Sequence, residues 1–130
     1  MRFAQITFLA TLLTAASVAA WAQPDLSGKW RATFETEGSE SREAEVVIDG
    51  QAGTWMTYSR GTPKDRRDSC IARPFPIILS SVDSSVMSLS IEASKTVEGC
   101  SNRKARITIV DTNTLEGTFG NGRALKLTRK

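Results

Sequence analysis

The sequence has 130 residues, with 17 basic and 14 acidic side chains, two cysteines and no histidine. This length allows one domain with one hydrophobic core, and the formal net charge of +3 is too small to indicate nucleic-acid binding. Without histidine, the chain lacks imidazole for acid–base catalysis and the commonest side-chain metal ligand. We therefore expect no metal site, no cofactor and no nucleic-acid partner.

The first predicted element is a secretory signal peptide at residues 1–22. Arg2 is the only charged residue of this segment, an apolar run extends from Ile6 to Ala20, and Ala20 to Ala22 form an A-x-A cleavage signal. The run is shorter than the roughly 20 apolar residues of a membrane span, and no cysteine lies nearby to carry a lipid anchor. We predict cleavage after Ala22, a single mature domain at residues 23–130 in the periplasm or outside the cell, and no membrane span after cleavage.

From Gly28 onward, apolar and polar residues mostly alternate, a pattern typical of half-buried antiparallel strands. Alternation and turn signals predict strands at 28–36, 43–49, 53–59, 70–73, 75–80, 86–94, 103–110, 114–119 and 123–129. The division around Pro74 and Pro76 stays open, because proline cannot donate a ladder hydrogen bond. Gly61 to Ser69 is expected to be a polar loop. About eight short strands joined by short turns predict an all-β, small antiparallel up-and-down β-barrel.

Cys70 and Cys100 are the two cysteines of the chain. An even number in an exported protein favours a disulfide bond. A reactive thiol pair would favour a close spacing such as C-x-x-C, which the chain lacks. We predict that Cys70 and Cys100 pair and stabilise the domain by closing a loop of about 30 residues.

Leu26 to Trp30, with the sequence LSGKW, resembles the G-x-W motif that begins the first strand of lipocalin-like, or calycin, β-barrels. The resemblance implies that Trp30 closes the bottom of the barrel. The chain is nearest in outline to Inh-type bacterial metalloprotease inhibitors, which are similar in size, in having one disulfide and in a final strand like LKLTR from Leu125 to Arg129. The chain lacks the tryptophan-rich ligand walls of avidins, and only Gln23 to Asp25 would stand for the trunk with which Inh-type proteins reach the protease.

Motifs that would indicate catalysis are weak. Ser101 to Lys104 matches an S-x-x-K pattern, but that pattern needs a helix and further motifs that the chain lacks. Carboxylate pairs such as Glu43 and Glu45 lie two residues apart in a strand, which is typical of a solvated outer face. We therefore predict that the protein is not an enzyme.

The side chains predicted to point inward are almost all large and apolar. They are Trp30, Phe34, Val46, Ile48, Phe75, Ile77, Leu79, Met87, Leu89, Ile91, Ile107, Ile109, Leu115, Phe119, Leu125 and Leu127. Protein interiors pack densely, so we expect a filled barrel without a pocket in the range of about 300–1,000 Å³ that is typical of small-ligand sites.

Six basic residues lie near the two cysteines in sequence. They are Lys64, Arg66 and Arg67 before Cys70, and Arg103, Lys104 and Arg106 after Cys100. If the disulfide forms, these side chains are expected at one end of the molecule, where they could bind an acidic protein or an acidic envelope component. The alternative is that both segments are solvated loops, partly neutralised by Asp65, Asp68 and Glu98.

With a filled interior, the sequence favours a secreted or periplasmic barrel that binds another protein, in its specific form an inhibitor of a hydrolase or toxin. Two alternatives stay open. One is a calycin-like carrier of a small molecule, and the other is an envelope-associated structural protein. The volume of any cavity inside the barrel distinguishes the protein-binding function from the carrier function.

Overall fold

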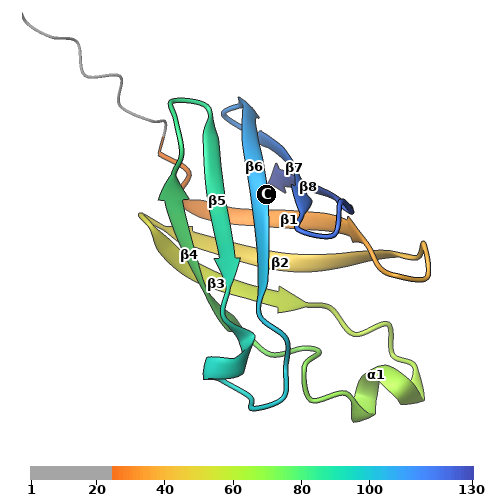
Figure 1. The fold of residues 1–130 in the computed structure, drawn as a ribbon. Helices are drawn as coiled ribbons and strands as arrows, with labels where there is room; N and C mark the ends of the chain where they lie inside the picture. The colour runs from red at the N-terminus through yellow and green to blue at the C-terminus, as the bar shows by residue number, and fades with distance from the viewer. Residues whose placement is uncertain (1–24) are drawn as a thin grey trace, which may run out of the picture.

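The computed structural model describes residues 25–130, which Figure 1 draws in colour. The predicted signal peptide at residues 1–22 lies outside the described residues and stays a prediction. Within the described part, no helix has the length and apolar character needed to cross a membrane.

Eight antiparallel strands close into one barrel, in which each strand pairs with the next and the last pairs with the first (Figure 1). The strands are β1 (Gly28–Glu35), β2 (Ser41–Asp49), β3 (Ala52–Thr57), β4 (Phe75–Ser81), β5 (Val86–Ile91), β6 (Arg103–Asp111), β7 (Thr114–Phe119) and β8 (Ala124–Arg129). This architecture confirms the predicted all-β up-and-down barrel. Closure gives every strand two neighbours, so the sheet has no free edge.

The structure corrects the prediction of a strand at 70–73. These residues form turns and irregular backbone before β4 begins at Phe75. Ala72 adopts a positive φ of 59°, which lies outside the extended region that a strand requires. The predicted strand at 86–94 also ends earlier, because Ala93–Lys95 form the 3-10 helix η1.

A second correction concerns the loop from Gly61 to Ser69, which contains the helix α1 (Pro63–Arg67). Thr62 caps this helix through its hydroxyl oxygen, which accepts a hydrogen bond from the Asp65 backbone N–H at 3.2 Å. Pro63 occupies the first turn, where its missing N–H costs nothing. A helix of five residues is too short to show an apolar stripe in sequence.

The core follows the predicted alternation. Every residue predicted to point inward is buried except Ile109, which is partly buried beside an irregularity in the β6–β7 pairing. Smaller side chains complete the interior, among them Ala32, Ala44 and Ala105.

The two ends of the barrel differ in their connections. At one end, tight turns join β2 to β3, β4 to β5 and β6 to β7. At the other end lie the long β3–β4 loop (58–74), which carries α1, and the β5–β6 loop (92–102), which carries η1. Figure 1 shows α1 and η1 together at the lower end of the barrel. We call the first the closed end and the second the open end.

Candidate functional site

Trp30 fills the closed end. Its side chain is fully buried, and its indole N–H donates a hydrogen bond to the Leu26 carbonyl oxygen at 2.8 Å. The guanidinium of Arg129 lies 4.3 Å from the centre of the indole ring and donates to the carbonyl oxygens of Ser27 and Thr112 at 2.8 and 2.9 Å. Arg129 thus connects the segment before β1, the β6–β7 turn and the Trp30 ring. The placement agrees with what the LSGKW resemblance implies for Trp30.

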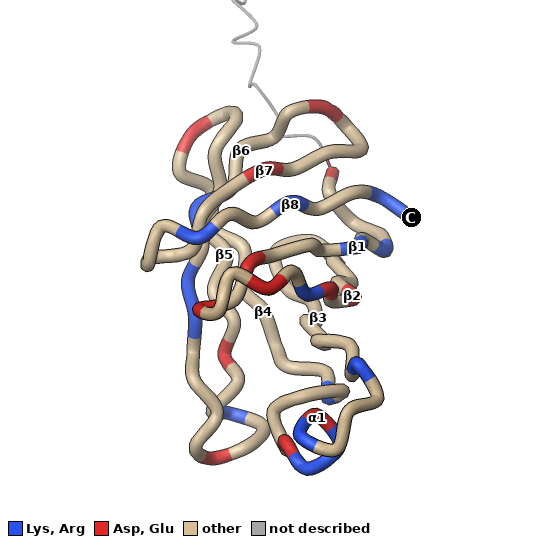
Figure 2. The backbone as a smooth tube through the Cα atoms, turned by 90° about the vertical axis from the view of Figure 1, so that its right-hand side faces the viewer, with Lys and Arg blue, Asp and Glu red and all other residues tan. Residues whose placement is uncertain are grey.

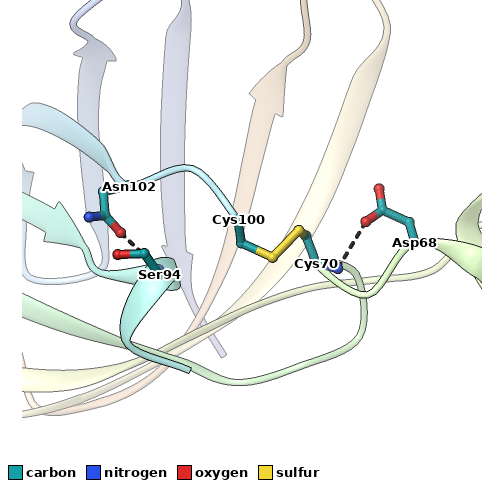
Figure 3. The surroundings of a disulfide bond; sticks show 5 residues. All are labelled: Asp68, Cys70, Ser94, Cys100 and Asn102. Carbon is teal, nitrogen blue, oxygen red and sulfur yellow. Dashed lines mark hydrogen bonds between the residues drawn. A yellow bond between two sulfur atoms is a disulfide. The ribbon is translucent and has the colours of Figure 1, made fainter. Parts of the chain in front are cut away.

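At the open end, the two long loops are joined covalently. Cys70 and Cys100 form a disulfide with their Cα atoms 5.7 Å apart (Figure 3), which confirms the predicted pairing. The bond connects the β3–β4 loop to the β5–β6 loop. The Cys70 backbone N–H also donates to the Asp68 carboxylate at 2.9 Å, which holds the turn on the Cys70 side of the disulfide.

A buried ion pair holds α1 against the barrel rim. Arg42 lies opposite Phe34 on the inner face of β2, and its two terminal nitrogens donate to the Asp65 carboxylate at 2.8 and 3.3 Å. The Asp65 carboxylate also accepts the Arg60 backbone N–H at 2.8 Å. The hydrogen bond from Arg42, followed by that from Arg60, lowers the pKa of the Asp65 carboxyl below its ordinary value of 3.8.

A cavity of about 330 Å³ lies at the open end. Its apolar lining includes four aromatic side chains and the disulfide, and its polar lining includes Arg42, Thr57, Asp68 and Arg103. The expectation of a filled interior without a small-ligand pocket is therefore wrong at this end, since 330 Å³ falls within the usual range of about 300–1,000 Å³. The physical reason is that inward positions near the rim carry arginine and threonine, whose polar groups do not fill an apolar core.

Three of the aromatic rings contact one another inside the cavity. Phe34 lies 5.4 Å from Trp55 and 6.1 Å from Phe119, and Trp55 lies 6.2 Å from Phe119, all measured between ring centres. The Trp55 indole N–H donates to the Thr57 hydroxyl oxygen at 3.1 Å. With that donor satisfied, the three rings present an apolar wall to whatever enters the cavity.

The six basic residues predicted near the cysteines do not form one cluster but lie in three places. Lys64, Arg103 and Lys104 line one broad depression of about 990 Å³ at the open end. Arg66 and Arg67 are exposed on α1, a segment on which Figure 2 shows charges of both signs. Arg106 lies further along β6. The pKa of Asp83 in the β4–β5 turn is lowered chiefly by the hydrogen bond from the Ser85 backbone N–H and least by the charge of Arg106. Their role in binding a partner stays a prediction.

Among these six residues, Arg103 alone lines the cavity. It lies on the same face of β6 as the buried Ala105 and Ile107, whereas Lys104 and Arg106 alternate with them on the outer face. Within residues 25–130, the Arg103 side chain has no hydrogen bond or ion pair. One of the six basic residues predicted from the sequence therefore forms part of the cavity wall.

Sequence reasoning missed Arg42, Trp55 and Thr57 as cavity residues. Arg42 immediately precedes the predicted strand 43–49, and it keeps the alternation of Ala44, Val46 and Ile48. Extending that strand by one residue would have placed the arginine inward. No sequence pattern indicated that its partner would be Asp65, 23 residues away.

No protein-family model and no curated protein sequence matches this chain. Solved structures with a similar fold include two redesigned β-barrels. The redesigned β-barrel mFAP1, bound to DFHBI, has a TM-score of 0.51 and 11% sequence identity, covering 81% of this chain and 94% of that one. A second redesigned β-barrel has a TM-score of 0.48 and 13% identity, covering 81% and 91%. The likeness to mFAP1 shows a shared fold, that of a small β-barrel.

Proposed function

We propose that this protein binds a small, largely apolar molecule at the open end of its barrel. The observation that carries the proposal is the 330 Å³ cavity with its wall of aromatic rings. Moving the apolar surface of a ligand out of water and against these rings is favourable. Because the disulfide already holds the two loops, less conformational entropy is lost when a ligand binds. That the structurally similar mFAP1 holds DFHBI supports the capacity of such a barrel to accept a small ligand.

The proposal assigns binding and no chemical step. The chain contains no histidine, and the polar side chains of the cavity wall are two arginines, threonines, a serine and one aspartate. These groups suit the orientation of a ligand through hydrogen bonds and charge.

We also propose that the protein works in the periplasm or outside the cell. The disulfide between Cys70 and Cys100 supports an oxidising compartment. If residues 1–22 are a signal peptide, mass spectrometry of protein recovered from the periplasmic fraction should find a mature chain that begins at Gln23. A chain that retains Met1 in the cytoplasm would contradict this proposal.

A fluorescent apolar dye, N-phenyl-1-naphthylamine, tests whether the cavity binds. The dye should bind the folded protein at one site. Ala93 is buried and lines the cavity, so Ala93→Leu should fill space there and weaken binding at least about tenfold, equivalent to about 1.4 kcal/mol. Ala124 is exposed on β8 at the same end but outside the cavity lining, which makes Ala124→Leu the matched control.

Two results would contradict the proposal. One is an absence of dye binding to the folded wild-type protein, and the other is an equal effect of both substitutions. Thermal unfolding of each variant verifies that it is folded before the titration is interpreted. Should Ala93→Leu prove unfolded, Ile91→Phe offers a second filling substitution, because Ile91 also lines the cavity.

Protein binding is the second candidate, and the 990 Å³ depression beside the cavity favours it. This depression is lined by side chains of both signs, among them Lys64, Glu35 and Glu37. A partner with a complementary pattern, such as a hydrolase or toxin that the protein inhibits, would bind there through charged contacts. Affinity capture from periplasmic extract tests this candidate, with Lys64→Glu expected to weaken the capture of any specific partner.

A further inference from the structure

Arg103 is placed to select the charge of a ligand. It occupies an inner-face position at the start of β6 and lines the cavity together with the aromatic wall. Its side chain has no hydrogen bond or ion pair within residues 25–130. A guanidinium without a partner keeps its donors available, and its planar fork matches an anionic group with two oxygens.

Arg42 adds a second guanidinium to the same cavity wall. Its two terminal nitrogens are engaged by Asp65 and by the Tyr58 carbonyl oxygen, which fixes the plane of the group. Its Nε is buried, and among the described residues no acceptor faces it. The donors of Arg42 are thus engaged or buried, and its contribution to the cavity wall is a fixed positive charge.

Acidic groups near the cavity oppose this attraction only in part. Asp68 is the carboxylate among the cavity-lining residues, and it already accepts the Cys70 backbone N–H. Asp65 lies outside the lining and is occupied by Arg42 and the Arg60 backbone. The charged side chains that line the cavity are thus two cations, Arg42 and Arg103, and one carboxylate, Asp68, so the balance of charge in the cavity wall favours an anion over a cation.

We infer that the ligand is a compact aromatic molecule with one anionic group, a carboxylate or sulfonate, bound with its rings against Phe34, Trp55 and Phe119 and its anion toward Arg103. This inference rests on the proposed function and adds the chemical class of the ligand. The cavity volume of about 330 Å³ limits the body to a few rings. The aromatic wall gives affinity, and the guanidinium gives selectivity for charge.

Two dyes with the same ring system test the inference. The dye 1-anilinonaphthalene-8-sulfonate carries an anion, and N-phenyl-1-naphthylamine is its neutral counterpart. The wild-type protein should bind the sulfonate at least about tenfold more tightly at low salt, because a charge-assisted hydrogen bond is among the stronger kinds. Added salt should weaken binding of the sulfonate and leave that of the neutral dye nearly unchanged.

Neighbouring residues of equal charge supply a matched pair of variants. Arg103→Gln should remove the preference for the sulfonate dye without changing affinity for the neutral dye. Lys104→Gln removes the same charge from the adjacent, outward position and should leave both affinities almost unchanged. Arg103→Lys should retain part of the preference, since it keeps the charge and loses the fork. Both positions are exposed, so the variants should fold.

The outcomes separate the inference from the function on which it rests. Binding of both dyes with equal affinity would overturn the anionic ligand and leave the cavity as a binding site. Equal losses in Arg103→Gln and Lys104→Gln would also overturn it, because a general surface charge would then explain the preference. If neither dye binds the folded protein, the proposed function itself fails.

Discussion

The guanidinium of Arg129 lies 4.3 Å from the centre of the Trp30 ring, and the two residues stand opposite each other where β8 pairs with β1. The last strand, β8, thus pairs with the first strand, β1, and Arg129 of β8 covers the buried ring of Trp30 on β1. A cation over an aromatic face is attracted by the ring quadrupole. Hydrogen bonds from Arg129 to the carbonyl oxygens of Ser27 and Thr112 hold it in place. The closed end is therefore a structural cap, which agrees with the assignment of the proposed binding site to the open end.

Truncation of Trp30 tests this cap. Trp30→Ala should lower the free energy of unfolding by about 3–5 kcal/mol, because it removes a fully buried ring and leaves a cavity. Urea denaturation followed by circular dichroism measures the change. Val110→Ala serves as control, since Val110 is 54% exposed and its truncation should change stability little. A loss below about 1 kcal/mol for Trp30→Ala would show that the ring does not carry the cap.

Much of the barrel could be predicted from the sequence because strand alternation is a local signal. The run of Ala44, Val46 and Ile48 alternates with polar residues, and it forms the inner face of β2 as expected. The two cysteines are equally informative, because two residues allow only one intramolecular pairing.

The cavity could not be predicted in the same way, because it depends on contacts between distant segments. Arg42 reaches Asp65 across 23 residues, and the disulfide joins loops whose course no alternation describes. An inward arginine also violates the apolar pattern from which the core was predicted. Such local violations of the pattern are expected at functional sites, and here they mark the wall of the cavity.

Removal of the disulfide should destabilise the protein. Cys70 and Cys100 are separated by 30 residues in sequence, and in the chain-entropy model a bond closing such a loop contributes about 3–4 kcal/mol. The double variant Cys70→Ala/Cys100→Ala should lose about that amount in urea denaturation. Thiol labelling of the unfolded, unreduced wild-type protein should find no free cysteine. Two reactive thiols per chain would contradict the observed pairing.

Gly117 is required by the close approach of β6 to β7. A methyl group at this position would lie 2.1 Å from the Arg106 carbonyl oxygen and 2.9 Å from Ile107 Cα, both backbone atoms. Gly117→Ala should therefore force the two strands apart and cost about 1–3 kcal/mol or more. Gly120 provides the control, because a methyl group there meets no atom within 4 Å. Equal unfolding midpoints for Gly117→Ala and Gly120→Ala would contradict this account of the strand contact.

The ion pair between Arg42 and Asp65 should make the stability of the open end depend on pH. The pKa of the Asp65 carboxyl is lowered in the folded protein, chiefly by the hydrogen bond from Arg42. As pH falls, the unfolded chain takes up this proton first, near the ordinary value of 3.8. The stabilisation is thus complete above that value and is lost as pH falls through the lower pKa of the folded state.

Comparison of the wild-type protein with the Asp65→Asn variant isolates the contribution of the Asp65 carboxyl. Other carboxyls with a lowered pKa are present in both the wild type and the variant, among them Asp25, Glu40 and Asp83. At pH 7 the wild-type protein should unfold at a higher urea concentration than the variant. The difference should be constant down to about pH 5 and shrink steadily toward pH 2 as Asp65 becomes protonated. A difference that stays the same over this whole range would show that the charge of Asp65 does not contribute to holding α1 on the barrel.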